Sequence, residues 1–419
     1  MSVSARALRS AGLDWVESIP EDWGTPSVGA NFEVQLGKML NPSAAAGDSL
    51  RPYLRNINVQ WDRIDLDDLP LMHFDAGDRA RYALRPGDLL VCEGGEVGRA
   101  AVWDGQLEDC YYQKALHRVR PYRDDSTRFL MYTLTAAASQ GVFENEGNTS
   151  TIVHLTAEKL RGHRFPWPQP AEQRAITDFL DAESARIDAV VAARRRQVQL
   201  LNEARPAVLE AHLPRVETAA LRIKRVAVMS AGGTPDTDKP SYWATDEGIP
   251  WVAIADMSGG GTVTATQKHV TVAGQGAARL RTGDTGVVLL AMYASVGATA
   301  FLGITASWNQ AILGLTPRAD LAEPRFLRYW LDHLAAYWPT VVKSNTQANL
   351  NAESVREAPF PDTAVVEQAA AADALDAQFE ALNRREVLLK REVDLFLERR
   401  QALITAAVTG QLEIPGATA

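Results

Sequence analysis

Hydrophobic residues recur at every seventh position in two segments that contain no glycine, from Pro170 to about Arg205 and from Asp362 to about Val408. Seven-residue spacing sustained over four or more heptads predicts long helices that pack lengthwise on one another. The positions of this predicted coiled-coil seam are Leu180, Ile187, Leu201, Val208, Leu375, Leu382, Leu389, Phe396 and Leu403. Arg194 interrupts the apolar row of the first helix, and Pro206 should kink or end that helix.

The two seams lie about 195 residues apart and share one register. Two in-register seams on one chain favour an intramolecular antiparallel pair of helices. The alternative, in which each helix only covers its own globular domain, stays open. At about 1.5 Å per residue, the segment from Ala171 to Arg205 would form a rod of roughly 50 Å.

The segments in front of these helices, 24–165 and 222–360, have a different pattern. They are rich in Gly, Pro and Thr and contain short β-branched runs such as 249–254 and 286–290. Runs of this kind, bounded by turn residues, predict short strands. We therefore expect an α+β fold in which two globular domains are separated by two long antiparallel coiled-coil helices.

The chain also repeats itself. The recurring pairs are Leu84–Asp88 with Leu280–Asp284, Arg128–Leu130 with Arg325–Leu327, Phe165-Pro166 with Phe360-Pro361, and Glu172-Gln173 with Glu367-Gln368. A unit copied once predicts a pseudo-two-fold protein, which suits a target that is itself two-sided. The two copies differ most in their front segments, so the two sides of that target should differ as well.

Composition narrows the class of protein. With 46% hydrophobic and 23% charged residues, the chain is typical of globular proteins, and 419 residues exceed what one hydrophobic core serves. The N-terminal segment lacks the apolar stretch of a secretory signal, so we expect a cytoplasmic protein without a membrane span. The two cysteines, Cys92 and Cys110, form no CxxC pair, which argues against a disulfide framework or a thiolate zinc site. The net charge of −9 means that any contact with nucleic acid would use local basic patches.

Several short motifs, in this order and duplicated, resemble the specificity (S) subunit of type I restriction–modification systems over essentially the whole chain. The motifs are the opening Trp15–Trp23, the stretch Gly232–Trp243 followed by Gly248–Val252, the two Leu-Arg-x-Gly-Asp turns, the two Phe-Pro segments that lead into Glu-Gln, and the ending Leu403–Leu412. The resemblance implies two target-recognition domains, each reading one half of a split DNA sequence. It also implies that the helices set the gap between the half-sites.

The family's organisation gives expected boundaries and partners. We expect a first target-recognition domain at 1–169, a central spacer helix at 170–213, a second target-recognition domain at 214–361, a C-terminal spacer helix at 362–410 and a tail at 411–419. The implied partners are double-stranded DNA, two methyltransferase (M) subunits and restriction (R) subunits. S-adenosylmethionine, ATP and Mg are implied for those partner subunits, and no cofactor is expected in this chain.

The sequence lacks the motifs of the relevant catalytic chemistry. The chain has neither an Asn-Pro-Pro-aromatic motif for a flipped base nor a GxxxxGK[ST] phosphate loop, and its seven His residues form no paired ligand pattern. We therefore predict no catalytic residues and no metal ligands, and a non-catalytic role in a methyltransferase and endonuclease complex.

Candidate DNA contacts follow from side-chain chemistry and loop position. Asn and Gln pair with adenine, Arg and Lys with guanine, and hydroxyl and basic groups with phosphate. The candidates in the first repeat are Lys38, Arg55, Asn56, Asn58, Lys114, Asn148 and Thr149. Those in the second repeat are Thr234, Lys239, Tyr242, Tyr293, Asn309, Gln310, Lys343, Asn345 and Gln347.

Two other functions stay open from the sequence. One is an adaptor of the same architecture whose front domains bind protein instead of DNA, which the acidic balance favours. The other is a nuclease with a dispersed acidic metal site such as Asp62, Asp65 and Asp67, although acids in a polar loop are commonly just solvated.

Overall fold

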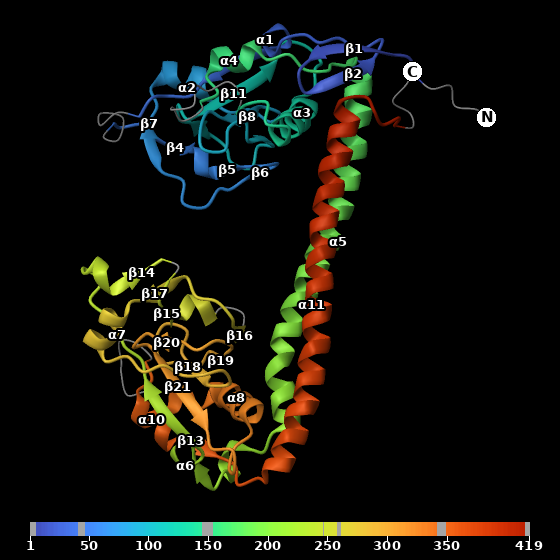
Figure 1. Ribbon diagram of the computed structural model, residues 1–419. Coiled ribbons are helices and arrows are strands. Elements are labelled where there is room, and N and C mark those ends of the chain that lie inside the picture. Colours follow the sequence, from blue (N-terminus) through green and yellow to red (C-terminus); the bar gives the residue numbers. More distant parts are fainter. Residues whose placement is uncertain are drawn as a thin grey trace, which may run out of the picture. The chain divides into compact units, whose positions relative to one another are not determined.

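The structure is a computed structural model that describes residues 6–40, 47–144, 154–245, 247–257, 261–341 and 349–414. The chain forms two compact units, and each unit combines a globular domain with part of both long helices (Figure 1). The first unit contains Met1–Arg195 and Lys390–Ala419, and the second contains Arg196–Leu389. The predicted α+β fold with two domains, two long antiparallel helices and an internal duplication is confirmed by these units and by the topology described below.

The domain of the first unit contains a hairpin, three small sheets or ribbons and four short helices. Its strands are β1 (Leu8–Leu13), β2 (Val16–Pro20), β3 (Phe32–Leu36), β4 (Leu50–Leu54), β5 (Val59–Gln60), β6 (Arg63–Ile64), β7 (Leu71–His73), β8 (Leu89–Cys92), β9 (Ala100–Val102), β10 (Tyr111–Tyr112) and β11 (Leu116–Pro121). Its helices are α1 (Val28–Asn31), α2 (Ala76–Tyr82), α3 (Thr127–Ser139) and α4 (Ala157–Gly162), with the 3₁₀ turn η2 (Asn56–Asn58). The main sheet has the strand order β3-β11-β8-β9, and a second sheet has the order β10-β4-β7.

The domain of the second unit repeats this arrangement. Its strands are β12 (Leu221–Arg222), β13 (Ala227–Ala231), β14 (Trp243–Ala244), β15 (Ile249–Val252), β16 (Thr262–Val263), β17 (Lys268–Val270), β18 (Val288–Ala291), β19 (Thr299–Leu302), β20 (Ser307–Trp308), β21 (Ile312–Pro317) and β22 (Pro359–Phe360). Its helices are α6 (Ile223–Val226), α7 (Val272–Ala278), α8 (Pro324–His333), α9 (Trp338–Val341) and α10 (Ala352–Glu357), with the 3₁₀ turns η3 (Val216–Thr218), η4 (Pro240–Tyr242), η5 (Ile254–Met257) and η6 (Leu334–Ala336).

The strand orders show the duplication directly. The order β13-β21-β18-β19 in the second domain matches β3-β11-β8-β9 in the first, and β16 is added at its edge. In both domains a parallel pair lies in the second sheet, β10 with β4 and β20 with β15. The sequence repeat is therefore a repeat of topology.

Two long helices contribute to both units. Helix α5 extends from Pro170 to His212 and helix α11 from Val365 to Val408. Helix α5 continues through Pro206 to His212, so of the two expected effects of this proline, a kink or an end, the end does not occur. Pro206 and Asn202 are both exposed, so the carbonyl group that loses its helical partner stays accessible to water.

Within each unit the helices pack side by side and antiparallel (Figure 1). In the first unit, Ile187 and Val191 of α5 pack on Val393 of α11. In the second, Leu209 and Leu375 share one core. All the predicted seam positions are buried or partly buried, which places this stripe against protein and not against water.

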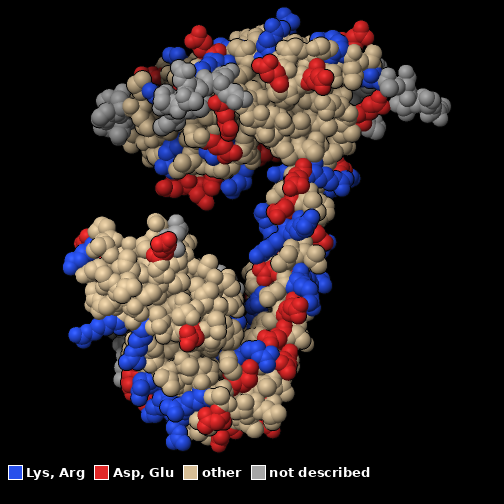
Figure 2. Space-filling view, in the orientation of Figure 1, with Lys and Arg blue, Asp and Glu red and all other residues tan. Residues whose placement is uncertain are grey.

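Ion pairs fix the register of the two helices. Asp188 pairs with Arg400 at 2.6 Å and Arg194 with Glu392 at 2.7 Å in the first unit. Arg205 pairs with Glu386 at 3.1 Å in the second. Arg194, which interrupts the apolar row, therefore lies beside a carboxylate of the facing helix, and acidic and basic residues alternate along this part of the surface (Figure 2).

We expect the substitution Leu375→Ala to lower the free energy of unfolding by roughly 2–5 kcal/mol, because this side chain is 0% exposed within the core of the second unit. The control Leu388→Ala removes the same atoms from a side chain of the same helix that is 62% exposed. It should change stability by less than about 0.5 kcal/mol. Denaturant unfolding followed by circular dichroism measures both, and equal losses would show that Leu375 does not stabilise the helix pair.

Both cysteines are buried and free, as expected of small apolar side chains. Burial raises the pKa of Cys110 to about 12, which keeps the thiol protonated and unreactive. Among the described residues, no helix is long and apolar enough to cross a membrane.

Candidate nucleic-acid interface

Two loops of the first domain cross at very close range. The loop after β3 begins at Gly37, whose backbone N–H donates to the carbonyl oxygen of Leu116 at 3.0 Å. A Cβ atom on Gly37 would lie 2.3 Å from the carbonyl oxygen of Gln113, so only glycine fits there. Beyond the glycine, Lys38 forms a parallel bridge with Gln113, and the Lys114 N–H donates to the Lys38 carbonyl oxygen at 2.8 Å. The crossing brings Gln113 and Lys114 to one place, with the Lys114 side chain exposed.

The second domain contains the same crossing with different side chains. Gly233 donates to the carbonyl oxygen of Trp308 at 2.9 Å, and a Cβ atom on Gly232 would lie 2.0 Å from the carbonyl oxygen of Asn309. The Thr234 hydroxyl donates to the side-chain carbonyl oxygen of Gln310 across the two loops. The backbone arrangement is thus common to both repeats, whereas the polar groups that it presents are not.

Further candidates of the second domain lie in neighbouring loops. The Lys239 ammonium is 5.3 Å from the ring centre of Tyr242, and 57% of the Lys239 side chain is exposed. A cation held against an aromatic face in this way suits contact with a phosphate or a base. Asn309 is used locally, since its side-chain oxygen accepts from the backbone N–H of Ala311 at 3.0 Å.

Tyr293 is 37% exposed and borders a cavity of about 1050 Å³. The cavity is lined by the turn 293–298 together with Asp332, Ala335 and Asn349. Burial raises the pKa of Asp332 to about 6, although the hydrogen bond that its carboxylate accepts from the Thr299 hydroxyl at 2.7 Å lowers this pKa. This carboxyl group therefore changes charge near neutral pH at the edge of the predicted interface.

Two candidates of the first domain, Lys38 and Asn58, are engaged in contacts within the domain. The Lys38 ammonium donates to the carbonyl oxygen of His73 at 2.6 Å and pairs with Asp78, and only 14% of its side chain is exposed. Asn58 is 3% exposed, and its amide group accepts from the Arg55 N–H at 2.9 Å and donates to the Asp65 carbonyl oxygen at 3.1 Å. Contact of either side chain with DNA would require these local bonds to be exchanged.

Arg55 and Asn56 are partly exposed but already have partners. Arg55 donates to the carbonyl oxygen of Asp68 at 2.8 Å. The Asn56 side chain donates to the Gly94 carbonyl oxygen at 2.8 Å and accepts from Arg99 at 2.8 Å. Base contact by either residue would require these bonds to be exchanged. The remaining candidates lie outside the described residues: Asn148, Thr149, Lys343, Asn345 and Gln347.

The acidic residues proposed for a nuclease site, Asp62, Asp65 and Asp67, do not form a metal-binding cluster. Asp62 pairs with Arg128, and the Asp65 carboxylate accepts from the backbone N–H of Asp67 at 3.0 Å. The part of the chain that the structure describes contains no group of three or more His, Cys, Asp or Glu side chains that could hold a metal ion. The geometry therefore gives this alternative no support.

The structure makes three residues prominent that were not among the candidate DNA contacts. Gln113 lies at the loop crossing of the first domain, where Asn309 lies in the second. Arg128 and Arg325 connect each domain to a long helix. A signal existed, because all three belong to fragments that recur about 195 residues apart in the sequence.

Comparison with known proteins identifies the class. Residues 52–199 match the family described as Type I restriction modification DNA specificity domain. One similar solved chain, from a structure concerned with complex assembly and conformational transition of the type I R-M system, is 17% identical with a TM-score of 0.75. The match covers 94% of this chain and 99% of that chain. The HsdS subunit from Thermoanaerobacter tengcongensis is 18% identical with a TM-score of 0.56, over 94% of this chain and 98% of that chain.

The two duplicated domains and the two long antiparallel helices give this chain the fold of the HsdS subunit of a type I restriction–modification system. Residues 52–199 match the specificity-domain family and the chain has the fold of the HsdS subunit, which together confirm the resemblance drawn from its motifs. At these identities the structural likeness concerns the fold, and individual contacts are argued from this chain's own residues.

Proposed function

We propose that this chain is the DNA-binding specificity subunit of a type I restriction–modification complex and that it recognises an asymmetric, bipartite site on double-stranded DNA. The observation that supports the proposal is the duplicated loop crossing at Gly37 and Gly232. One backbone arrangement presents Gln113 and Lys114 in the first domain and Asn309 and Gln310 in the second. Because the side chains at these equivalent positions differ in length and charge, the two half-sites should differ.

The chain would act without catalysis of its own, as a scaffold for two M subunits and for R subunits. S-adenosylmethionine, ATP and Mg would belong to those partners, and the assembly would work in the cytoplasm. The helices offer a surface for docking: in the second unit, Val387 and Leu388 of α11 are 65% and 62% exposed. Adjacent large apolar side chains on an exposed helix face are typical of a protein interface.

The experiment that tests the proposal combines the chain with its M partner and sequences methylated bases in a host genome or DNA library. The complex should methylate a split motif with two unlike halves. Purified chain alone should transfer no methyl group from S-adenosylmethionine. Methylation of a single continuous motif would contradict the bipartite proposal, and absence of specific DNA binding by the whole complex would favour the adaptor alternative.

Within this experiment we expect Gln310→Ala to relax one base position of one half-site, at a cost of about 1–3 kcal/mol in binding. Lys114→Ala should weaken binding to all sequences alike and reduce the salt dependence by about one charge. Lys159→Ala, which removes an exposed lysine of α4 in the same domain, is the matched control. Filter binding over a series of salt concentrations measures the effect, and a Gln310→Ala variant with both half-sites altered would count against separate readers.

A further inference from the structure

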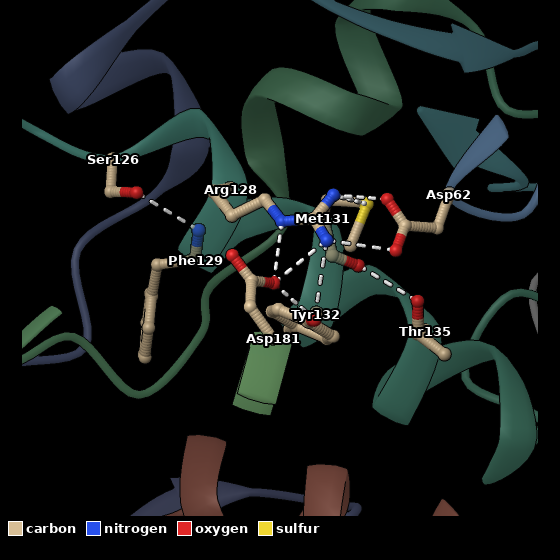
Figure 3. Close-up of polar contacts among 8 residues, drawn as sticks. All are labelled: Asp62, Ser126, Arg128, Phe129, Met131, Tyr132, Thr135 and Asp181. Atoms are coloured by element: carbon tan, nitrogen blue, oxygen red, sulfur yellow. Dashed lines mark hydrogen bonds and ion pairs between the residues drawn. The ribbon is translucent and has the colours of Figure 1, made fainter. Parts of the chain in front are cut away.

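The same set of side chains holds each domain to a long helix. In the first unit, Arg128 lies in the first turn of α3, and its guanidinium donates to one carboxylate oxygen of Asp181 in α5 at 2.7 and 2.9 Å. Tyr132, one turn further along α3, donates to the same oxygen at 2.5 Å. Figure 3 shows the two side chains converging on Asp181 from the domain side. We call this set the first joint.

The second unit contains the equivalent second joint. Arg325 lies near the start of α8 and contacts Asp376 of α11 at 2.6 Å, while the Tyr329 hydroxyl donates to Asp376 at 2.6 Å. The spacing of arginine and tyrosine is the same in both joints, and the two aspartates lie about 195 residues apart in the sequence. Because the same contacts occur in both copies although the surrounding loops differ, we infer that they have a role common to both domains.

A buried glutamine accompanies each joint. Gln173 of α5 accepts from the backbone N–H of Ser126 at 2.7 Å, and Gln368 of α11 accepts from the backbone N–H of Glu323 at 3.0 Å. Both glutamines are 0% exposed. Each one therefore ties its helix to the residue that caps the domain's helix, α3 or α8, next to the arginine. An arginine fork and a buried amide together restrict rotation of the domain about the helix axis.

The joints differ in their remaining partners. Arg128 also pairs with Asp62, its Nη2 atom lying 2.8 Å from a carboxylate oxygen of Asp62, in the turn between β5 and β6 of the domain (Figure 3). Arg325 instead contacts Glu323 at 2.9 Å and Asp373 of the helix at 2.7 Å. The first arginine thus bridges the helix to the turn between β5 and β6, which comes shortly after η2 in the chain. Within the described part of the chain, the ion pairs of Arg325 join it to its own helix cap and to α11.

We propose that Arg128 and Arg325 are positioning residues: each fixes its domain at one angle on the helix pair and so restricts the accepted DNA target to one gap length. The proposal rests on the proposed function, since a gap exists only if the two domains read two half-sites. A domain that turns about the helix axis reaches different base pairs, so a loosened joint admits gaps one base pair longer or shorter. The arginines touch no DNA in this account and act through the angle of the domain.

The first arm of the test measures the joint without DNA. Spin labels on Asp104→Cys in the domain and Ala193→Cys in α5 can be attached selectively, because both sites are exposed and both native cysteines are buried. We expect Arg128→Met to broaden the distribution of label distances in the whole chain. Arg123→Met, which removes an exposed arginine of the same domain, should leave the distribution unchanged. An unchanged distribution in Arg128→Met would overturn the proposal whatever the chain binds.

The second arm measures gap discrimination by the complex with its M partner on a library of split sites whose gaps differ by one base pair. We expect Arg128→Met to reduce the preference for the wild-type gap by about tenfold, a factor typical of losing a charged hydrogen bond. Arg128→Lys should restore part of the preference, because a lysine keeps the charge but cannot bind both aspartates as a fork. Tyr132→Phe, which removes one hydrogen bond, should have a smaller effect in the same direction.

The outcomes separate three cases. A merely structural role would lower methylation at every gap alike and leave the preference intact, which would overturn the proposal. Failure of the wild-type complex to methylate any split site would overturn the proposed function, and the label distances would still report on the joint. A broadened distance distribution together with relaxed gap preference in Arg128→Met, and neither change in Arg123→Met, supports the positioning role.

Discussion

Inserting one heptad into both long helices, after Val191 and after Leu395, is expected to widen the gap between the two half-sites by about three base pairs while both half-sites keep their sequences. The ion pairs Asp188–Arg400 and Arg194–Glu392 bracket the two insertion points, so the inserted segments face one another. Seven residues add about 10 Å to each helix, and B-DNA rises about 34 Å per turn of roughly ten base pairs.

The register of the helices explains why the insertion must be made in both. A heptad keeps the buried stripe on one side, so Ile187 and Leu403 stay in contact with the facing helix. Four residues added to α5 alone should turn that stripe toward water and abolish specific methylation. Sequencing of methylated bases reads the gap directly, and an unchanged gap after the double insertion would leave the helices as docking surfaces only.

Replacing residues 32–165 by a second copy of residues 227–360 should convert the asymmetric target into one that contains the second half-site twice. The exchange is chosen because β3 and β13 begin equivalent sheets and because both joints use an arginine and a tyrosine four residues apart. Arg325 and Tyr329 would take the places of Arg128 and Tyr132 opposite Asp181. Methylome sequencing measures the result.

The converse exchange, with residues 32–165 copied over 227–360, is the control for this experiment and should give a target with the first half-site twice. Wild-type chain expressed with the same M partner supplies the reference motif. Persistence of the original first half-site after the exchange would mean that residues outside 32–165 read it, and the separation into two readers would then be wrong.

The fold was largely predictable because its two strongest features are periodic. Heptad spacing depends only on local sequence, and the recurrence of Arg128 and Arg325 marks the copied unit. The continuation of α5 through Pro206 was not predictable from the heptad pattern alone. Pro206 normally stops a helix, and its tolerance depends on the exposure of this face, which only the packed helix pair decides.

The candidate site was predictable only in part. Side-chain chemistry and loop position suggest Lys38 and Asn58 as candidate DNA contacts, but they do not show which residues of the domain these side chains contact. Lys38 finds Asp78 because β4 pairs with β7 and brings the segment after β7 to the loop after β3. Asn58 finds Asp65 through the ribbon of β5 and β6. Strand pairing determines which residues become partners here, and the local sequence around each residue does not predict that pairing.

The first unit is assembled from both ends of the chain. Ile19 and Trp23 of the N-terminal segment share a core with Ile404 and Val408 near the end of α11, and Gly410, with φ of 73°, ends that helix against Pro20. During synthesis the second unit is therefore complete first, although it is encoded later than most of the first. A chain truncated before Lys390 would keep all residues of the second unit but would lose the part of α11 that covers apolar residues of the N-terminal domain. We therefore expect C-terminal truncation to cause aggregation through the N-terminal domain.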